Sequence, residues 1–212
     1  NYRGRTSQPS MTDLLPITDT SDPLNISKGN PSLKPSYTNS FMLFYNTFLP
    51  EKQQSMMARL TFSNTINSVS NTVTYDEETG ARITQPKNIN GNWSASGGFV
   101  FNTPLKNKKF TVSTFSDGSY NNMVGFTSLS GQTDSQKNTT RSLNLSERLN
   151  GTFRNDWFEF GLNGGIRYNV SKSTLQPQSD KETFDYSFGA SSNVTLPWDV
   201  TVSTDASYSM KR

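Results

Sequence analysis

Phe158-Glu-Phe-Gly-Leu-Asn-Gly-Gly-Ile-Arg-Tyr-Asn-Val170 is the stretch that decides the fold. Its even-numbered positions are mostly apolar, while its odd-numbered positions hold Glu, Gly, Asn and Arg. Successive side chains of a β-strand point to opposite faces of a sheet, so this alternation predicts a long strand with one apolar and one polar face. The steps from Phe158 to Tyr168 project to roughly 25 Å at a strand tilt of about 40°, which matches the lipid-facing band of an outer-membrane barrel.

The same alternation recurs along the chain. It is strict over 89–103, 183–196 and 200–211, and weaker near 56–66, where a slip of phase before Val69 predicts a bulge. Residues 37–49 are apolar on both faces, so the pattern leaves their orientation open. We expect an all-β, antiparallel up-and-down meander, with a partial strand at 1–7 and eight complete strands at 37–49, 56–75, 83–103, 109–121, 141–153, 157–171, 182–196 and 199–211.

The connections between these strands alternate in length. Short turns are expected at 49–54, 104–109, 154–156 and 197–199. Longer segments are expected at 8–36, 121–140 and 171–181, with the tight 76–80 hairpin as an exception. Short turns at one rim and long loops at the other are typical of an outer-membrane barrel, with the long loops extracellular. We therefore divide the chain into a proline-rich extracellular loop at 8–36 and a strand meander at 37–212.

Composition excludes several functional classes. Apolar residues make up only 31% of the chain, which is too few for an ordinary globular core, whereas 12% are aromatic, unlike a disordered chain. The absence of His and Cys removes the Ser-His-Asp triad, the Cys nucleophile and imidazole or thiolate metal sites. We expect no enzymatic activity and no cofactor. Lys and Arg are scattered at a net charge of +3, and their strongest cluster, Lys106, Lys108 and Lys109, lies in a turn, so no nucleic-acid partner is expected.

Both ends of the sequence look like cuts within a longer protein. Asn1 is not an initiator residue, and the chain stops at Tyr208–Arg212 inside a strand pattern. We therefore expect a fragment of a barrel. Three questions stay open at this point: whether the fragment closes by itself, how many strands the whole barrel has, and what its oligomeric state is.

The polar faces of these strands supply the first set of candidate site residues. They are expected to face a wet lumen, where they line a permeation path or contact a plug: Arg59, Arg148, Glu159, Arg167, Asp185 and Asp205. Glu147 conflicts with this pattern because it falls on the apolar side, so either a bulge shifts the phase or the strand is misassigned there. In the loop, the spacing of Asp13, Asp19, Asp22 and Asn25 matches no EF-hand, so we interpret these residues as solvated.

Three segments of the first loop carry a family resemblance. Pro9-Ser-Met-Thr-Asp-Leu-Leu-Pro16, Ser21-Asp-Pro-Leu-Asn-Ile26 and Gly29-Asn-Pro-Ser-Leu-Lys-Pro35 resemble the Gly-Asn-Pro-x-Leu-Lys-Pro loop of TonB-dependent receptor barrels, and the match is closest to the Bacteroidetes-type outer membrane β-barrel family. Thr79-Gly80, Gln85-Pro-Lys-Asn88 and Asn90-Gly91 are similar to that family's hairpin and following strand. Ser36 is a departure, because the family normally has an acidic residue there.

The resemblance implies uptake of a nutrient across the bacterial outer membrane. It implies membrane lipid, a plug domain and the TonB energy-coupling protein as partners, the last two through regions outside this sequence, and a surface lipoprotein as a further possible partner. Five prolines stiffen the loop, because each fixes one backbone dihedral. We expect an ordered extracellular cover, with these candidate residues: Pro9, Leu14, Asn30, Pro31, Leu33 and Pro35.

Two other functions stay open from the sequence. One is a passive or structural outer-membrane barrel without energy coupling, which a plug domain upstream of Asn1 would argue against. The other is a secreted β-rich adhesin or binding module, which would fold without detergent. The transported substrate is not encoded in any recognisable motif.

Overall fold

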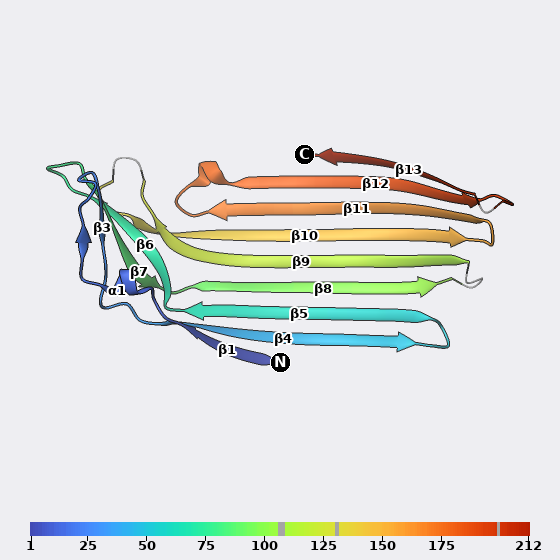
Figure 1. Ribbon diagram of the computed structural model, residues 1–212, viewed down its shortest axis with the longest axis horizontal. Helices are drawn as coiled ribbons and strands as arrows, with labels where there is room; N and C mark the ends of the chain where they lie inside the picture. The colour runs from blue at the N-terminus through green and yellow to red at the C-terminus, as the bar shows by residue number, and fades with distance from the viewer. Residues whose placement is uncertain (106–108, 130–131, 199) are drawn as a thin grey trace.

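The computed structural model describes residues 1–105, 109–129, 132–198 and 200–212. It is an all-β structure, as predicted, and most of the strands form one antiparallel nine-stranded sheet, which we call the wall sheet (Figure 1). From edge to edge its strands are β1 (Tyr2–Ser7), β4 (Ser36–Leu49), β5 (Gln54–Ile66), β8 (Asn92–Pro104), β9 (Phe110–Thr127), β10 (Gln136–Arg154), β11 (Phe158–Ser173), β12 (Lys181–Thr195) and β13 (Thr201–Lys211).

The wall sheet is open and consists of sequential neighbours. Its edges are β1 and β13, and no pairing joins them in the described part of the chain. The predicted antiparallel meander is confirmed, and every predicted strand lies within the observed ones apart from shifted ends and two breaks. No helix among the described residues has the length and apolar character needed to cross a bilayer.

The register brings most of the apolar positions of the nine strands onto one face. Phe62 of β5 lies opposite both Phe41 of β4 and Ala95 of β8, and Leu145 of β10 lies opposite Tyr168 of β11. This register also settles the orientation of residues 37–49, which the sequence left open. Because a shift of one residue would exchange the two faces, the continuous apolar face fixes the register across the sheet.

Glu147 stays on the apolar face without a bulge. It lies opposite Ile166 of β11 and Ser116 of β9, in unbroken ladders. The hydroxyl group of Thr114 donates a hydrogen bond to its carboxylate. Both explanations offered by the sequence, a bulge and a misassigned strand, are therefore wrong. A side-chain hydrogen bond instead compensates the carboxylate for its apolar surroundings.

The connections are sorted by length, as predicted. β4–β5, β8–β9, β10–β11 and β12–β13 are joined at one end of the wall sheet, and the longer segments gather at the other end, which we call the rim (Figure 1). The expected 121–140 loop is wrong in extent, because β9 continues to Thr127 and β10 already begins at Gln136. Of the cluster expected in the 104–109 turn, Lys106 and Lys108 lie outside the described residues.

Two predicted strands are each broken in two. The range 56–75 divides at Asn67, whose φ is 54°, and 83–103 divides at Asn90–Gly91, where Gly91 has a φ of 119°. The two breaks adjoin, because the backbone N–H of Asn67 donates to Oδ1 of Asn90 at 2.6 Å. The sequence suggested a bulge here. The structure shows instead two adjoining strand breaks, which we call the joint, and the chain leaves the wall sheet there.

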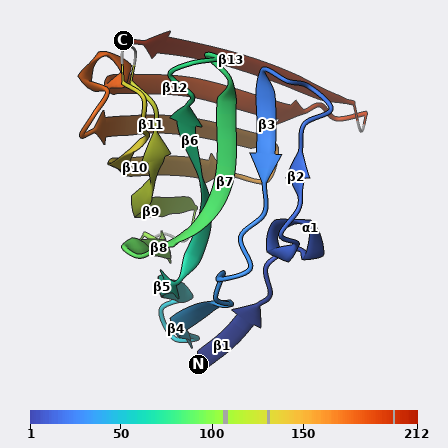
Figure 2. The same ribbon diagram turned by 90° about the vertical axis from the view of Figure 1, so that its left-hand side faces the viewer.

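Beyond this joint lies a second sheet, which we call the rim sheet (Figure 2). Its order is β2 (Thr18–Asp19), β3 (Asn25–Lys28), β7 (Arg82–Ile89) and β6 (Ser68–Tyr75), and β3 runs parallel to β7. The expected loop at 8–36 thus contains two short strands and a helical turn, α1 (Met11–Leu14), none of which the sequence predicted. A 3-10 turn, η1 (Pro177–Ser179), lies between β11 and β12.

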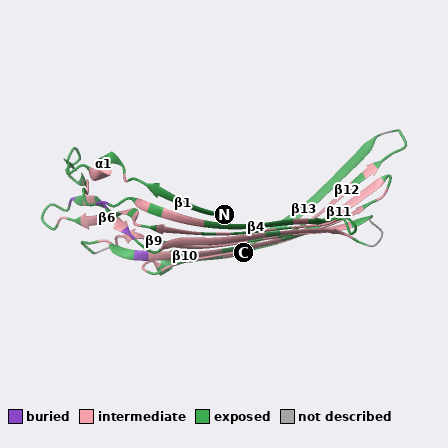
Figure 3. Ribbon diagram, turned by 90° about the horizontal axis from the view of Figure 1, so that it is seen from below, coloured by how far each residue is buried: buried purple, intermediate pink, exposed green. Residues whose placement is uncertain are grey.

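Burial is concentrated at the rim (Figure 3). The buried hydrophobic side chains among the described residues all lie there or at the adjoining strand ends: Leu33, Ala81, Ile89 and Val124. Large apolar side chains of the wall sheet are exposed instead, and Leu162 and Phe188 each keep 54% of their surface accessible. Because none of the described residues forms a second layer over this apolar face, the face requires an apolar medium.

Candidate functional site

A row of alternating charges crosses the other face of the wall sheet. The row begins at Arg59 of β5, which pairs with Gly98 of β8, and Gly98 pairs with Asp117 of β9. Asp117 pairs with Ser146 of β10, and Ser146 pairs with Arg167 of β11. The row then continues through Asp185 of β12 to Lys211 of β13. We call Arg59, Asp117, Arg167, Asp185 and Lys211 the charge row. Arg167, Asp185 and Lys211 are direct cross-strand neighbours, so their side chains lie side by side. One strand separates Arg59 from Asp117, and one separates Asp117 from Arg167.

The six residues predicted to face the lumen lie on this one face. Arg59, Arg167 and Asp185 belong to the charge row, and Arg148 lies next to it, opposite Gly165. Glu159 is near the short turns, where its carboxylate forms an ion pair with Arg154 at 2.7 Å. Asp205 lies opposite Ser191, away from the row. That this face is the lumen of a barrel stays a prediction at this point.

The sequence analysis did not single out Asp117 and Lys211. Both follow from alternation, because they are out of phase with the apolar residues of their own strands, Phe110 and Val112 in β9 and Met210 in β13. A hollow of about 400 Å³ is lined by Asp117, Arg148, Arg167, Asp185 and Lys211, among others. This hollow offers both cationic and anionic groups to a polar ligand or to a protein segment.

An apolar patch lies on the same face, beside the charge row. It consists of Met42, Phe44, Met57, Val100 and Phe115. Met57, Val100 and Phe115 are direct cross-strand neighbours, and Phe44 lies opposite Arg59. Phe44 is 56% exposed, and Phe115 is 40% exposed. Bulky apolar groups are therefore exposed on the polar face.

Two of the segments that carry the family resemblance, 29–35 and 85–88, contact each other at the rim. The Asn30 side chain donates to the carbonyl oxygen of Pro86 at 3.0 Å. Asn88 Oδ1 accepts from the Lys34 backbone N–H at 2.8 Å, and its amide group donates to the carbonyl oxygens of Lys34 and Asn67. The Gly-Asn-Pro-Ser-Leu-Lys-Pro segment is thus fastened along β7 by side-chain amides.

Gly29 is required by close packing. A Cβ atom built there would lie 1.9 Å from the carbonyl oxygen of Leu15, next to the helical turn α1. Any larger residue would push α1 away from the strand, and glycine is the residue that permits such approach.

The six candidate loop residues differ in their surroundings. Leu33 is buried, with 7% exposure, while Pro9, Leu14 and Asn30 are half-buried and Pro31 and Pro35 are exposed. The loop is ordered over the rim, but its apolar residues are not all covered within this chain. Four remain exposed: Met11, Leu15, Ile17 and Leu24.

Three acidic side chains of the rim accept hydrogen bonds within their own turns. The backbone N–H and hydroxyl of Thr79 donate to the Asp76 carboxylate, each at 2.8 Å, and hold the pKa of Asp76 below its ordinary value. The Ser21 hydroxyl lowers the pKa of Asp19, and the Asn25 amide lowers that of Asp22, in the same way. Within the described residues, no three His, Cys, Asp or Glu side chains are grouped as metal ligands.

These features define a class of protein. The sheet is antiparallel, with an exposed apolar face and a charged opposite face. It has short turns at one end and longer connections at the other. This combination is typical of the wall of an outer-membrane β-barrel. A model of the outer membrane protein beta-barrel family matches residues 1–157, and the chain belongs to that family. It is accordingly a protein of the bacterial outer membrane, in contact with lipid. No curated protein and no solved structure matches it.

Replacing Asn88 with Ala tests how the rim is fastened. The change leaves the Lys34 N–H and two carbonyl groups without their partners, so we expect the rim sheet to lose about 2 kcal/mol of local stability. Amide hydrogen exchange in the full-length protein should become faster in β7 and β3 and stay unchanged in β10 and β11. Asn71→Ala, at an exposed position of β6, is the matched control. Equal exchange in the two variants would contradict the fastening role.

Proposed function

We propose that this chain is part of the barrel of a TonB-dependent importer, in which a plug domain fills the lumen behind the charge row. The barrel takes up a nutrient too large for passive pores and has no enzymatic activity or cofactor of its own. The plug and the TonB energy-coupling protein act through parts of the protein outside this sequence.

The apolar patch is the observation that carries this proposal. In a water-filled pore, Met42, Phe44, Met57 and Phe115 would expose apolar surface to solvent, each at 40% or more of its area. Removing apolar area from water is worth roughly 25 cal/mol per Å², which favours a barrel whose lumen contains protein. A passive barrel, the second candidate, gives no physical reason for these residues on the polar face.

The charge row supports the same proposal. A plug has to be held in the lumen and yet move when the transporter works, and partly hydrated charges of both signs suit a reversible contact. Among the described residues, the only ion pair is Arg154–Glu159, so Arg59, Asp117, Arg167 and Asp185 have no partner within ion-pair distance in this chain. A polar contact surface of this kind resembles a transient interface more than a permanent core.

Single cysteines distinguish a plugged lumen from an open one, because this chain contains no natural Cys. In the purified full-length protein, with any Cys outside this chain replaced by Ser, Phe115→Cys should react slowly with a water-soluble maleimide. Met11→Cys, at a rim position that is 79% exposed, should react rapidly and is the control. Both ends of the barrel are accessible in detergent, so protection reports contact inside the lumen. Equal labelling rates would contradict the plug.

Energy coupling is tested separately, in cells. Uptake of a nutrient that depends on this protein should stop when the TonB-type coupling protein is deleted. Uptake that persists without the coupling protein would contradict energy coupling and would indicate a passive barrel, whether plugged or open. A surface lipoprotein is the further partner that we propose, at the exposed rim residues Met11, Ile17 and Leu24.

A further inference from the structure

Two cations are direct neighbours on the lipid-facing side of the wall sheet. Arg141 of β10 and Lys172 of β11 are cross-strand partners, and both are exposed. Their row continues through Asn122 of β9 to Trp93 of β8. Like charges directly opposite each other in a sheet are destabilising, so this pair, which we call the cation pair, calls for a counter-charge.

The described part of the chain does not supply that counter-charge. On the neighbouring strand and turn, Glu182 accepts a hydrogen bond from the Tyr168 hydroxyl at 2.8 Å, and Asp180 accepts one from the Ser173 backbone N–H at 2.7 Å. In the described part of the chain, neither carboxylate lies within ion-pair distance of Arg141 or Lys172.

The cation pair lies at the level of an aromatic row. Tyr2, Phe41, Phe62, Trp93 and Tyr120 form this row across five strands, and successive ring centroids are 4.9 to 6.5 Å apart. Rows of aromatic residues mark the interface between the hydrocarbon layer and the lipid headgroups. Arg141 and Lys172 are therefore at headgroup height, on the extracellular side if the rim faces outward.

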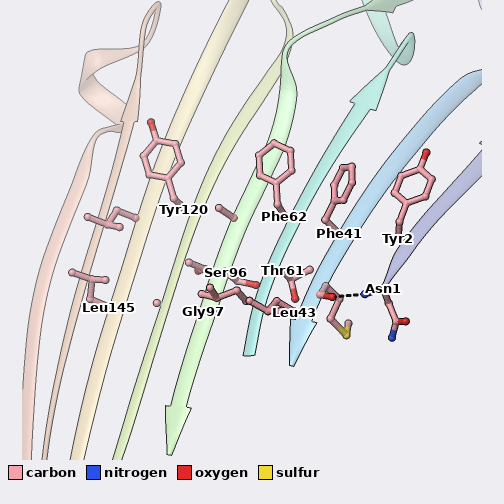
Figure 4. A pocket seen from close by; sticks show the side chains of 16 residues that line it. Asn1, Tyr2, Phe41, Leu43, Thr61, Phe62, Ser96, Gly97, Tyr120 and Leu145 are labelled. Carbon is pink, nitrogen blue, oxygen red and sulfur yellow. Dashed lines mark hydrogen bonds between the residues drawn. The ribbon is translucent and has the colours of Figure 1, made fainter. Parts of the chain in front are cut away.

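An apolar groove begins directly beneath the cation pair. Its volume is about 750 Å³, and its lining includes Leu143, which is the next residue on the same face after Arg141. Two glycines that are cross-strand partners, Gly97 and Gly118, form its floor, between Leu60 and Leu145. Figure 4 shows the rings of Tyr120, Phe62, Phe41 and Tyr2 above this groove.

We propose that the cation pair and the groove together bind one phosphorylated lipid of the outer leaflet. A lipid phosphate lies between Arg141 and Lys172, and an acyl chain of the same molecule runs over Leu143 and Leu145 to the glycine floor. The phosphate of the lipid supplies an anion for the cation pair, and its acyl chain fills the apolar groove. The site rests on membrane location and on a rim that faces outward, and it is independent of plug or transport.

Binding of lipid A, a phosphorylated glycolipid, to the purified full-length protein tests this site. Native mass spectrometry in detergent measures how much lipid A is retained by the wild type and by R141Q/K172Q. Each basic residue near a lipid surface contributes about 1 kcal/mol, so the double variant should bind roughly 30-fold more weakly. R3Q/R5Q is the matched control, because these two arginines lie near the rim on the opposite face of β1.

A second variant tests the groove without altering charge. Gly118→Leu places a side chain on the groove floor, where the nearest atom to a new Cβ is the mobile Cδ2 of Leu145 at 3.2 Å. It should reduce retention of lipid A while the barrel stays folded, as shown by its resistance to denaturation in detergent.

Three outcomes would overturn the proposal. The first is equal retention of lipid A by wild type and R141Q/K172Q. The second is an equal loss in R3Q/R5Q, which would indicate a general effect of net charge. The third is competition by inorganic phosphate as effective as by lipid A, since that would identify a soluble-anion site; phosphatidylcholine, which lacks a net negative charge, should compete poorly.

Discussion

Leu162→Arg is expected to destabilise the folded barrel by about 2 to 4 kcal/mol, because it places a charge on the lipid-facing side of the wall. Leu162 is 54% exposed on the apolar face of β11, opposite Ala190 and Gly151, so lipid is its main neighbour in the membrane. The measurement is a reversible unfolding titration of the full-length protein in lipid vesicles.

The adjacent residue provides the control. Asn163 lies on the polar face, opposite Gly189 and Asn150, and Asn163→Arg should cost much less, because an arginine there meets water or protein. Equal losses for the two variants would mean that the faces do not correspond to lipid and lumen. A larger loss at Asn163 would reverse the assignment of the two faces.

Deletion of residues 14–30 is expected to abolish uptake or partner docking while leaving the wall folded. The deleted segment contains β2 and β3 and pairs with β7 of the rim sheet, whereas the nine strands of the wall sheet pair only with one another. Thermal unfolding followed by β-sheet circular dichroism should therefore change little. Uptake of the dependent nutrient, or capture of a surface partner, should be lost.

A smaller deletion at the same rim separates this effect from general damage. Removal of Pro177–Ser179 shortens the β11–β12 connection without altering the rim sheet, and it should preserve uptake. If the 14–30 deletion prevented folding of the barrel, the loop would be structural. If uptake were unchanged, the loop would have no functional role.

The wall could be predicted from the sequence because a sheet with different media on its two sides imposes a period of two on every strand. Phe158–Val170 shows this most clearly, and its neighbours repeat it in register. The charged residues of the polar face follow from the same rule. Arg167 and Asp185 are far apart in the chain, but alternation places both on one side.

The rim could not be predicted in this way. β2 and β3 are short and mostly polar, and β3 is a strand because it pairs with the distant β7. The break at Gly91 is hidden because the alternation from Ile89 to Phe101 runs through it without interruption. The apolar patch was missed for another reason: residues 37–49 are apolar on both faces, and only pairing with β5 shows that Phe44 lies beside Arg59.

The joint at Asn67 and Gly91 bears on how such a protein can vary over evolutionary time. A residue inserted within a continuous strand would turn all following side chains to the wrong side, and lipid would then face charge. At this joint both strands leave the wall sheet together through positive-φ residues, and the Asn67 backbone N–H donates a hydrogen bond to the Asn90 side chain. Insertions and deletions in the segments beyond the joint therefore affect only the rim. Segments of the rim can thus vary in length while the strands of the wall sheet keep their register.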